Sequence, residues 1–388
     1  MLSQLDKYLG KLHRDALVKP QRAALLVKDD TLLAQGPADL SSLGAAILER
    51  INVLALAIAE PLLPLTDLLI RRAAPDCRTL VPSDTETRTF LHDIPLVRKA
   101  EFATGASALL ADLLASRKGI IVEGVGIVTT GAMTPEMAYI NWSSVWHAVF
   151  VKYLSDLLTT GIRSPDDELM VAALREQYRR PITTVDCCVR ATPPVERSDI
   201  YAQIERIGRC TVDLQLVDSA FGNISWRDGG MIYISQTGAS LDELAGCIDP
   251  VPSDNSSTVG LTASSELLAH RRIYEATGAR AILHGHPKFA VVLSMLCAEP
   301  GCENIDCWKD CPRIRFLATT PIVPGEIGAG GLADQVAPVI GAAGTALVYG
   351  HGVFAIGREH FGEALERLVA VENWCRQEYF RRLVVRMT

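Results

Sequence analysis

The chain has 388 residues, and at about 150 residues per domain this length predicts two domains. With 48% hydrophobic and 21% charged residues, its composition is that of an ordinary globular protein and excludes collagen, coiled-coil and disordered chains. The 45 acidic residues outnumber the 38 basic ones, which gives a formal net charge of -7. Because no basic surplus is available to neutralise a phosphate backbone, we expect no nucleic-acid partner.

The sequence carries no pattern typical of a membrane span or a secretion signal. The longest apolar run, residues 51–70, is interrupted by two prolines and two acidic residues. Three charged residues stand among residues 1–11, where a signal peptide requires an apolar segment. We therefore expect a cytoplasmic protein with no membrane partner.

Two segments far apart in the chain, 120–131 and 346–357, share a pattern. Each contains two β-rich runs around a Gly-x-Gly turn, and at a constant offset the glycines at 124, 126 and 131 match those at 350, 352 and 357. Helix-like patterns follow at 136–158 and 362–383. A second match pairs Leu91-His-Asp-Ile-Pro with Leu283-His-Gly-His-Pro. These matches predict a tandem duplication.

Turn and linker residues between 162 and 200 place the expected boundary near residue 195, so we expect domains at 1–195 and 196–388. The copies differ, because the matches pair His286 with Ile94 and His351 with Val125. The first domain is therefore expected to lack a three-histidine site and to be catalytically silent.

Three histidines of the second copy have the pattern of metal ligands. In a strand, His284 and His286 point to the same face, since side chains alternate with a period of two. His351 stands between two glycines at a strand end or turn. Three neutral imidazoles that leave one position open are typical of a catalytic zinc site. The alternative is that these are unrelated polar residues at strand ends.

Two further segments supply candidate site residues. A helix is predicted to start near Thr262, with Ser264 or Ser265 capping it and Glu266 in its first turn, and to end at Gly278. A helix N-terminus with adjacent hydroxyls also binds phosphate. Residues 222–225 and 231–238 read as two strands separated by a turn at 228–230, with Asn223 and Thr237 as their polar tips.

On these ordered motifs, residues 200–388 resemble the class II aldolase/adducin family, which includes fuculose phosphate and rhamnulose phosphate aldolases, ribulose phosphate 4-epimerase and methylthioribulose phosphate dehydratase. The resemblance implies an α/β fold: a three-layer α/β/α sandwich with a mainly antiparallel central sheet, here in two tandem domains. Residues 85–165 resemble the family more weakly. Family members assemble as tetramers with sites between subunits.

The resemblance also implies roles for individual residues. Glu266 would be the acid/base, and His284, His286 and His351 would bind Zn2+, or Mn2+, Co2+ or Fe2+, because nitrogen ligands select weakly among these ions. Six residues would form the phosphate pocket: Gly222, Asn223, Thr237, Gly238, Ser264 and Ser265. The alternative for Glu266 is a solvated glutamate favoured by the helix dipole, and His270, one turn later, is expected to have a supporting or structural role.

The implied function is that of a metal-dependent aldolase or lyase, acting on a phosphorylated sugar or related hydroxy-carbonyl substrate through a metal-stabilised enediolate. A sugar-phosphate epimerase or dehydratase is an alternative, as is a non-catalytic adducin-like scaffold. Aldolases of the family use a tyrosine to protonate the leaving aldehyde, but no tyrosine occurs between His286 and Gly344. Neither Tyr349 nor Tyr379 is a secure match.

Four of the ten cysteines are clustered, in the pattern Cys297-x4-Cys302-x4-Cys307-x3-Cys311. Four thiolates suit a structural zinc or an iron–sulfur cluster. The spacing lacks the paired Cys-x2-Cys of common zinc modules, so a thiol-rich loop or disulfides are the alternatives.

The duplication predicts an assembly. Two chains with two domains each would supply the four domains of a tetramer-like ring, so we expect a homodimer or higher homo-oligomer in which the silent domain borders the active site. The alternative is a silent domain that only stabilises the fold.

Overall fold

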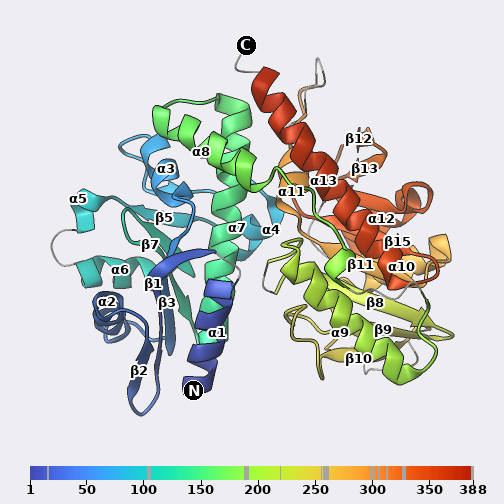
Figure 1. Cartoon of the computed structure of the whole chain (residues 1–388), viewed down its shortest axis with the longest axis horizontal. Coiled ribbons are helices and arrows are strands. Elements are labelled where there is room, and N and C mark those ends of the chain that lie inside the picture. Colours follow the sequence, from blue (N-terminus) through green and yellow to red (C-terminus); the bar gives the residue numbers. More distant parts are fainter. Residues whose placement is uncertain are drawn as a thin grey trace. The chain divides into compact units, whose positions relative to one another are not determined.

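The computed structural model describes residues 1–14, 17–102, 106–187, 192–218, 220–254, 256, 262–297, 299, 302–304, 306–311, 313–325 and 329–385. The chain divides into two compact units (Figure 1). The first consists of Met1–Ser83 and Thr87–Met170, and the second of Asp84–Glu86 and Val171–Thr388. Each unit contains one β-sheet with helices packed against it.

The segment up to residue 177 contains these elements: α1 (Leu2–Arg14), β1 (Val18–Lys28), β2 (Leu32–Gln35), α2 (Ala38–Leu48), β3 (Ala55–Pro61), α3 (Leu65–Arg72), β4 (Thr79–Leu80), α4 (Thr85–Leu91), β5 (Ile94–Val97), α5 (Lys99–Phe102), α6 (Ala106–Leu114), β6 (Gly119–Val122), β7 (Gly126–Gly131), α7 (Pro135–Thr160) and α8 (Pro165–Gln177).

The rest of the chain contains a short 3-10 helix (Val185–Cys187) and then α9 (Arg197–Asp213), β8 (Asn223–Asp228), β9 (Met231–Ser235), β10 (Ile248–Pro252), α10 (Leu267–Thr277), β11 (Ala281–Gly285), α11 (Lys288–Ser294), β12 (Arg315–Leu317), β13 (Thr320–Val323), α12 (Ala329–Ala343), β14 (Thr345–Val348), β15 (Val353–Gly357) and α13 (Phe361–Val385).

The sheet of the first unit has the strand order β2-β1-β3-β7-β6-β5-β4. Among its described strands only β5 and β6 pair in parallel. Alternate residues of β1 and β3, such as Leu26 and Ile58, pack against α2 and α6. Helices α1 and α7 also pack against the sheet. Helix α7 begins with Thr134, whose hydroxyl accepts a hydrogen bond from the Met137 amide.

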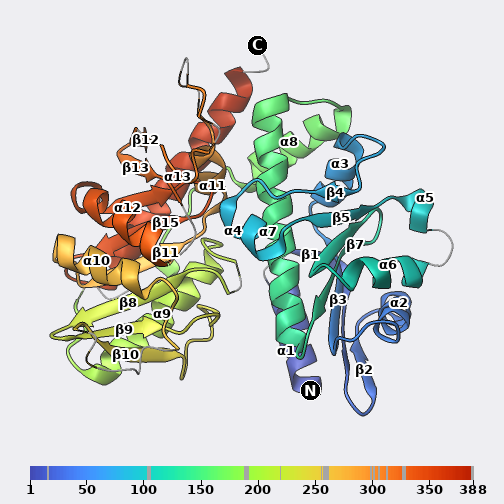
Figure 2. The ribbon, with the colours of Figure 1, turned by 180° about the vertical axis from the view of Figure 1, so that it is seen from behind.

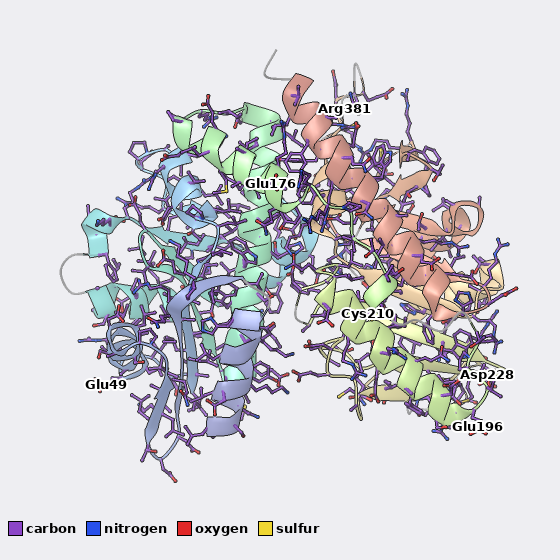
Figure 3. All side chains as sticks on the ribbon, in the orientation of Figure 1. Glu49, Glu176, Glu196, Cys210, Asp228 and Arg381 are labelled. Carbon is purple, nitrogen blue, oxygen red and sulfur yellow. The ribbon has the colours of Figure 1, made fainter. Side chains whose placement is uncertain are left out.

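The sheet of the second unit has the order β10-β9-β8-β11-β15-β14-β13-β12 (Figure 2). Among the described strands only β13 and β14 pair in parallel. Ile282 on β11 and Phe354 on β15 are buried against α10 and α12. Helices α9 and α13 pack on β8, β11 and β15. Cys210 is labelled on α9 and Arg381 near the end of α13 in Figure 3. The fold is thus mixed α/β, with one parallel pair in each otherwise antiparallel sheet.

The two sheets have matching topology over seven strands. Strands β3, β7, β6 and β5 occupy the places that β11, β15, β14 and β13 occupy in the second sheet, with the same strand directions. The register agrees as well, because Ala55 pairs with Gly131 as Ala281 pairs with Gly357. The residue numbers of the second pair exceed those of the first by the same constant that separates the matched glycines.

This topology corrects one of the two sequence matches. The counterpart of the histidine strand β11 is β3, whereas residues 91–95 lie at the end of α4 and the start of β5, which occupies the place of β13. The match of 91–95 with 283–287 is therefore wrong. The shared letters His and Pro were misleading, because strand position is decided by hydrogen-bond register and not by composition.

The division between the units also differs from the expected boundary at 195, because it follows Met170, within α8. The sequence 162–200 reads as a linker because of its prolines. However, a proline in the first turn does not break a helix, and three acidic residues stabilise the N-terminus of α8. No helix in the described part of the chain has the length and apolar character needed to span a membrane.

Candidate metal centre and active site

The three histidines come from two neighbouring strands of the second sheet. His284 lies on β11 opposite Phe354 of β15, and the two rings stack with centroids 4.0 Å apart. His286 follows the end of β11, and its ring stacks on Phe221. His351 lies in the turn between β14 and β15, next to Gly350, which has a φ of +59°. All three histidines are buried.

Four ligand groups converge at this point. The Nε2 atom of His284 lies 2.9 Å from Nε2 of His286 and 3.2 Å from Nε2 of His351. Oε1 of Glu266 lies 3.2 Å from Nε2 of His351, and its Oε2 lies 3.6 Å from Nε2 of His284. A tetrahedral zinc with bonds of about 2.0–2.1 Å has ligand-to-ligand distances of about 3.4 Å. The donor set therefore fits a divalent ion.

The surroundings of His284 prepare its Nε2 lone pair for a metal. Its Nδ1 donates to the carbonyl oxygen of Val353 at 3.1 Å, which leaves Nε2 unprotonated in the neutral ring. A Cβ atom at Gly352 would lie 2.9 Å from Cε1 of His284 and 3.0 Å from Cδ2 of His286. Glycine at 352 thus leaves room for both rings.

Glu266 is placed differently from the sequence expectation. It is the N-cap residue of α10 and not a first-turn residue, and its side chain makes no capping hydrogen bond. The carboxylate instead turns to the histidines, and Nδ2 of Asn223 donates to Oε2 at 2.7 Å. Its side chain is only 12% exposed, which argues against a solvated glutamate. The predicted helix end at Gly278 is confirmed, with a φ of +66°.

The electrostatics of the metal-free cluster suit a cation. Burial raises the pKa of Glu266, but His284, His351 and the Asn223 hydrogen bond outweigh it and hold that pKa below its usual range. Burial lowers the pKa of His284 to about 4. For His351 burial acts in the same direction, yet Glu86 and Glu266 raise its pKa to about 10. A divalent ion bound at Nε2 of His351 would replace the proton that this nitrogen carries in the charged ring.

Glu86, which belongs to the second unit, is a site residue that the sequence did not reveal. Its Oε2 lies 3.1 Å from Nδ1 of His351, on the ring edge opposite the other ligands, although the angle is poor for a hydrogen bond. Thr85 places it, because both its amide and its hydroxyl donate to the Gly350 carbonyl oxygen, at 2.6 and 2.9 Å. A carboxylate at this edge orients a metal-binding imidazole and raises its basicity.

Replacing Glu86 with glutamine should therefore weaken metal binding by at least about tenfold, the usual scale for such a partner. Competition with a chromophoric chelator measures the affinity directly. The exposed Glu275 on α10 supplies the control variant, Glu275→Gln, which should bind metal as the unaltered chain does. Equal affinity in Glu86→Gln and the control would show that Glu86 does not orient His351.

The six residues implied as a phosphate pocket form two groups. Asn223, the first residue of the neighbouring strand β8, pairs with His284, and Gly222 directly precedes that strand. Thr237, Gly238, Ser264 and Ser265 lie on two adjoining loops, joined by the Thr237 amide, which donates to the Thr262 carbonyl oxygen at 2.9 Å. Of these, Thr237, Gly238 and Ser265 are exposed, whereas both ends of the Asn223 amide are hydrogen-bonded within the protein.

In the part of the chain that the structure describes, the clustered cysteines do not converge as the three histidines do. The four thiols are free, which fits the alternative of a thiol-rich loop and not that of disulfides. Cys307 and Cys311 donate to the carbonyl oxygens of Asn304 and Arg313. Metal binding by the four cysteines stays a prediction.

Neither candidate tyrosine is placed as a proton donor. Tyr379 is fully buried on α13, where it packs against Phe289 and Phe380. Tyr349 is half-buried, with the Arg315 guanidinium over its ring. The residue that would protonate a leaving group is therefore not identified among these two.

The first unit holds different residues at the corresponding positions. By the strand register and the matched glycines, Ile58, Glu60 and Val125 stand where the second unit has His284, His286 and His351. Glu60 is paired with Lys19 and with Arg22, whose Nε donates at 2.9 Å. A neutralised carboxylate beside two apolar residues cannot replace three imidazoles.

The second part of the chain is similar in sequence to known proteins. Residues 202–379 match the family model described as Class II Aldolase and Adducin N-terminal domain. An L-fuculose phosphate aldolase from Methanococcus maripaludis is 26% identical over 155 residues, which cover 40% of this chain and 82% of that protein.

Two solved structures are also similar. An L-fuculose-1-phosphate aldolase from Thermus thermophilus has 27% identity and a TM-score of 0.40, over 48% of this chain and 97% of its own. A sugar-phosphate aldolase from Thermotoga maritima has 17% identity and a TM-score of 0.35, over 48% of this chain and 96% of its own. The family match and the sequence relative both support a relationship of residues 202–379 to the class II aldolase and adducin family.

Proposed function

We propose that the chain is a metal-dependent lyase of the class II aldolase type, which cleaves a phosphorylated sugar or a related hydroxy-carbonyl compound. The observation that carries this proposal is the convergence of His284, His286 and His351 with the buried carboxylate of Glu266. A sequence relative that is an L-fuculose phosphate aldolase supports the substrate class. A scaffold protein would have no need of this donor set.

In the proposed reaction, His284, His286 and His351 would hold Zn2+, with Mn2+, Co2+ or Fe2+ as alternatives. The ion supplies Lewis-acid stabilisation of negative charge that develops on the substrate's oxygen atoms. Glu266 moves the proton, because its Oε1 lies 3.2 Å from Nε2 of His351 while its Oε2 is hydrogen-bonded to Asn223. Burial keeps bulk water away from this carboxylate, so proton transfer occurs at a fixed position.

The substrate phosphate would bind the exposed loop residues Thr237, Gly238 and Ser265, together with Ser264 and the N-terminus of α10. Amide groups at a helix N-terminus attract anions. We propose a small-molecule phosphorylated substrate on this basis.

An epimerase or dehydratase of the same family is the second candidate, since it would use the same acid/base and metal. The burial of Tyr379 among aromatic rings, which removes it as a proton donor, is the observation that favours this candidate. Incubating the metal-loaded protein with a panel of ketose phosphates separates the reactions. Release of dihydroxyacetone phosphate from a ketose 1-phosphate indicates aldol cleavage, whereas a product with all carbon atoms retained indicates epimerisation or dehydration.

We also propose that the two units are tandem copies of one fold, of which the first is catalytically silent. Two observations support this proposal: the two sheets have matching strand orders, and the paired strand residues and the matched glycines differ in residue number by one constant. A cytoplasmic homodimer, with four such units, is the assembly that we propose.

One metal ion per chain, and not two, is the expected stoichiometry, because Ile58 and Val125 offer no ligand in the first unit. Elemental analysis of untagged protein against a quantitative amino-acid analysis gives the ratio. A second tightly bound ion per chain would contradict a silent first unit.

A further inference from the structure

A row of polar side chains extends from Glu266 into the core of the second unit. Glu266, His270 and Tyr274 are spaced four residues apart along α10, and Asn223 and Ser225 lie two residues apart on β8. Four helical residues rise about 6 Å and two strand residues about 6.6 Å, so the two rows interdigitate. We call these five residues the polar ladder.

Each neighbouring pair in the polar ladder is within hydrogen-bond distance. Nδ2 of Asn223 donates to Oε2 of Glu266 at 2.7 Å, and Oδ1 of Asn223 lies 2.5 Å from Nε2 of His270. The Ser225 hydroxyl lies 2.7 Å from Nδ1 of His270 and 2.6 Å from the Tyr274 hydroxyl. Ser225 and His270 have no solvent exposure, and Tyr274 is 2% exposed.

The protons of the polar ladder can be placed from its acidic end. The Glu266 carboxylate only accepts, so Asn223 presents its NH2 group to it and its oxygen to His270. His270 must therefore carry its proton on Nε2. Burial lowers the pKa of His270 to about 3, so the ring is neutral and its Nδ1 is an acceptor.

The remaining protons follow in the same direction. The Ser225 hydroxyl must donate to Nδ1 of His270, and this hydrogen bond uses the single proton of the hydroxyl. The contact between Ser225 and Tyr274 then requires the Tyr274 hydroxyl to donate, since two oxygens at 2.6 Å without a proton would repel each other. The Arg280 carbonyl oxygen, 3.3 Å from the Tyr274 hydroxyl, receives at most a weaker share of that proton.

We propose that Tyr274, Ser225 and His270 are positioning residues, which fix Oε2 of Glu266 through Asn223 and leave Oε1 facing His351. All donors point toward the carboxylate, so each hydrogen bond polarises the next and the two carboxylate oxygens become inequivalent. Oε2 is held in place, and Oε1 is the atom that moves the proton. The kinetic consequence rests on the proposed function, whereas the direction of the protons does not.

The proton direction can be tested without any substrate. Long-range 1H–15N correlation spectra of the side chains in 15N-labelled, full-length protein distinguish the two histidine tautomers. We expect His270 to be protonated on Nε2, with Nδ1 an accepting nitrogen whose resonance shifts in the Ser225→Ala variant. A proton on Nδ1, or on both nitrogens, would overturn the proposed direction.

The positioning role predicts a specific kinetic pattern for Ser225→Ala. We expect kcat to fall about tenfold, while KM and metal content stay within about twofold, because a buried acceptor loses its donor but no ligand is removed. Ser225→Thr, which keeps the hydroxyl, should restore kcat to within about threefold. Thr211→Val removes another buried hydroxyl, on α9, and serves as the matched control.

The outcomes separate the two proposals. An unchanged kcat in folded Ser225→Ala, or an equal loss in Thr211→Val, would reject the positioning role. If Ser225→Ala does not fold, Tyr274→Phe supplies the same test, because it removes the first donor and keeps the ring. The expected tautomer without activity on any ketose phosphate would instead reject the proposed function and leave the proton direction standing.

Discussion

Replacing His286 with alanine is expected to lower the bound metal from one ion per chain to an undetectable level. Its Nε2 lies 2.9 Å from Nε2 of His284, and these two nitrogens with that of His351 are the buried donors of the site. The two remaining imidazoles are too few to hold the ion tightly, because catalytic zinc sites use three protein ligands and Oε2 of Glu266 is already hydrogen-bonded to Asn223. Elemental analysis after dialysis measures the loss.

His92→Ala is the control for this change, because His92 is exposed and far from these ligands in sequence. It should keep one ion per chain. Equal occupancy in His286→Ala and His92→Ala would show that the metal binds elsewhere. A thermal unfolding curve on each protein separates lost ligation from lost folding, since His286→Ala should unfold like the metal-free unaltered chain.

Replacing Glu266 with glutamine should leave metal content unchanged and lower kcat by a factor of about 100 or more, the usual scale for loss of a general acid or base. Glutamine has the same shape and can still accept from Asn223, but its amide cannot take up a proton at neutral pH. The three imidazoles remain in place to hold the ion. Steady-state rates on the best ketose phosphate, corrected for metal content, give the ratio.

Glu275→Gln on the same helix is the matched control, because its carboxylate is exposed and pairs only with Arg272 in the contacts described for it. It should retain full activity. Full activity in Glu266→Gln with normal metal content would remove Glu266 from the mechanism and favour a non-carboxylate base.

The sequence allowed the histidine group and its strands to be predicted, because period-two spacing and flanking glycines are local features. His284 lies on β11, His286 directly follows that strand, and His351 lies in a turn between two strands. The turn between β8 and β9 at residues 228–230 was also predictable from its glycines, and Asp228 is labelled there in Figure 3. Such short-range patterns depend on backbone geometry alone.

Long-range partners could not be predicted in the same way. Glu86 and His351 lie in distant parts of the chain, and no local pattern connects them. Only one side of the polar ladder could be predicted from the sequence. A polar residue at every fourth position from Glu266 to Tyr274 indicates a polar stripe along a helix, but the pairing of that stripe with β8 can be known only from the structure. His270 was expected to be supporting, without a partner assigned.

Spacing by itself decides neither the cysteine pattern nor the second sequence match. The cysteine pattern gave thiols close in sequence, yet metal binding depends on loop conformation, and in the described residues Cys307 and Cys311 donate to backbone carbonyl oxygens. The match of residues 91–95 relied on shared letters, whereas by strand order β11 corresponds to β3, Ala55–Pro61, which shares little with residues 281–287 except the alanine and the proline. Register identifies such a counterpart, and composition does not.

In the proposed function, a metal at His284, His286 and His351 supports cleavage of a phosphorylated sugar. Its most direct test is a titration of chelator-treated, full-length protein with Zn2+ while dihydroxyacetone phosphate release from a ketose 1-phosphate is measured. We expect no activity without metal and a linear rise that ends at one zinc per chain. Cleavage that persists at the same rate in the metal-free protein would contradict it.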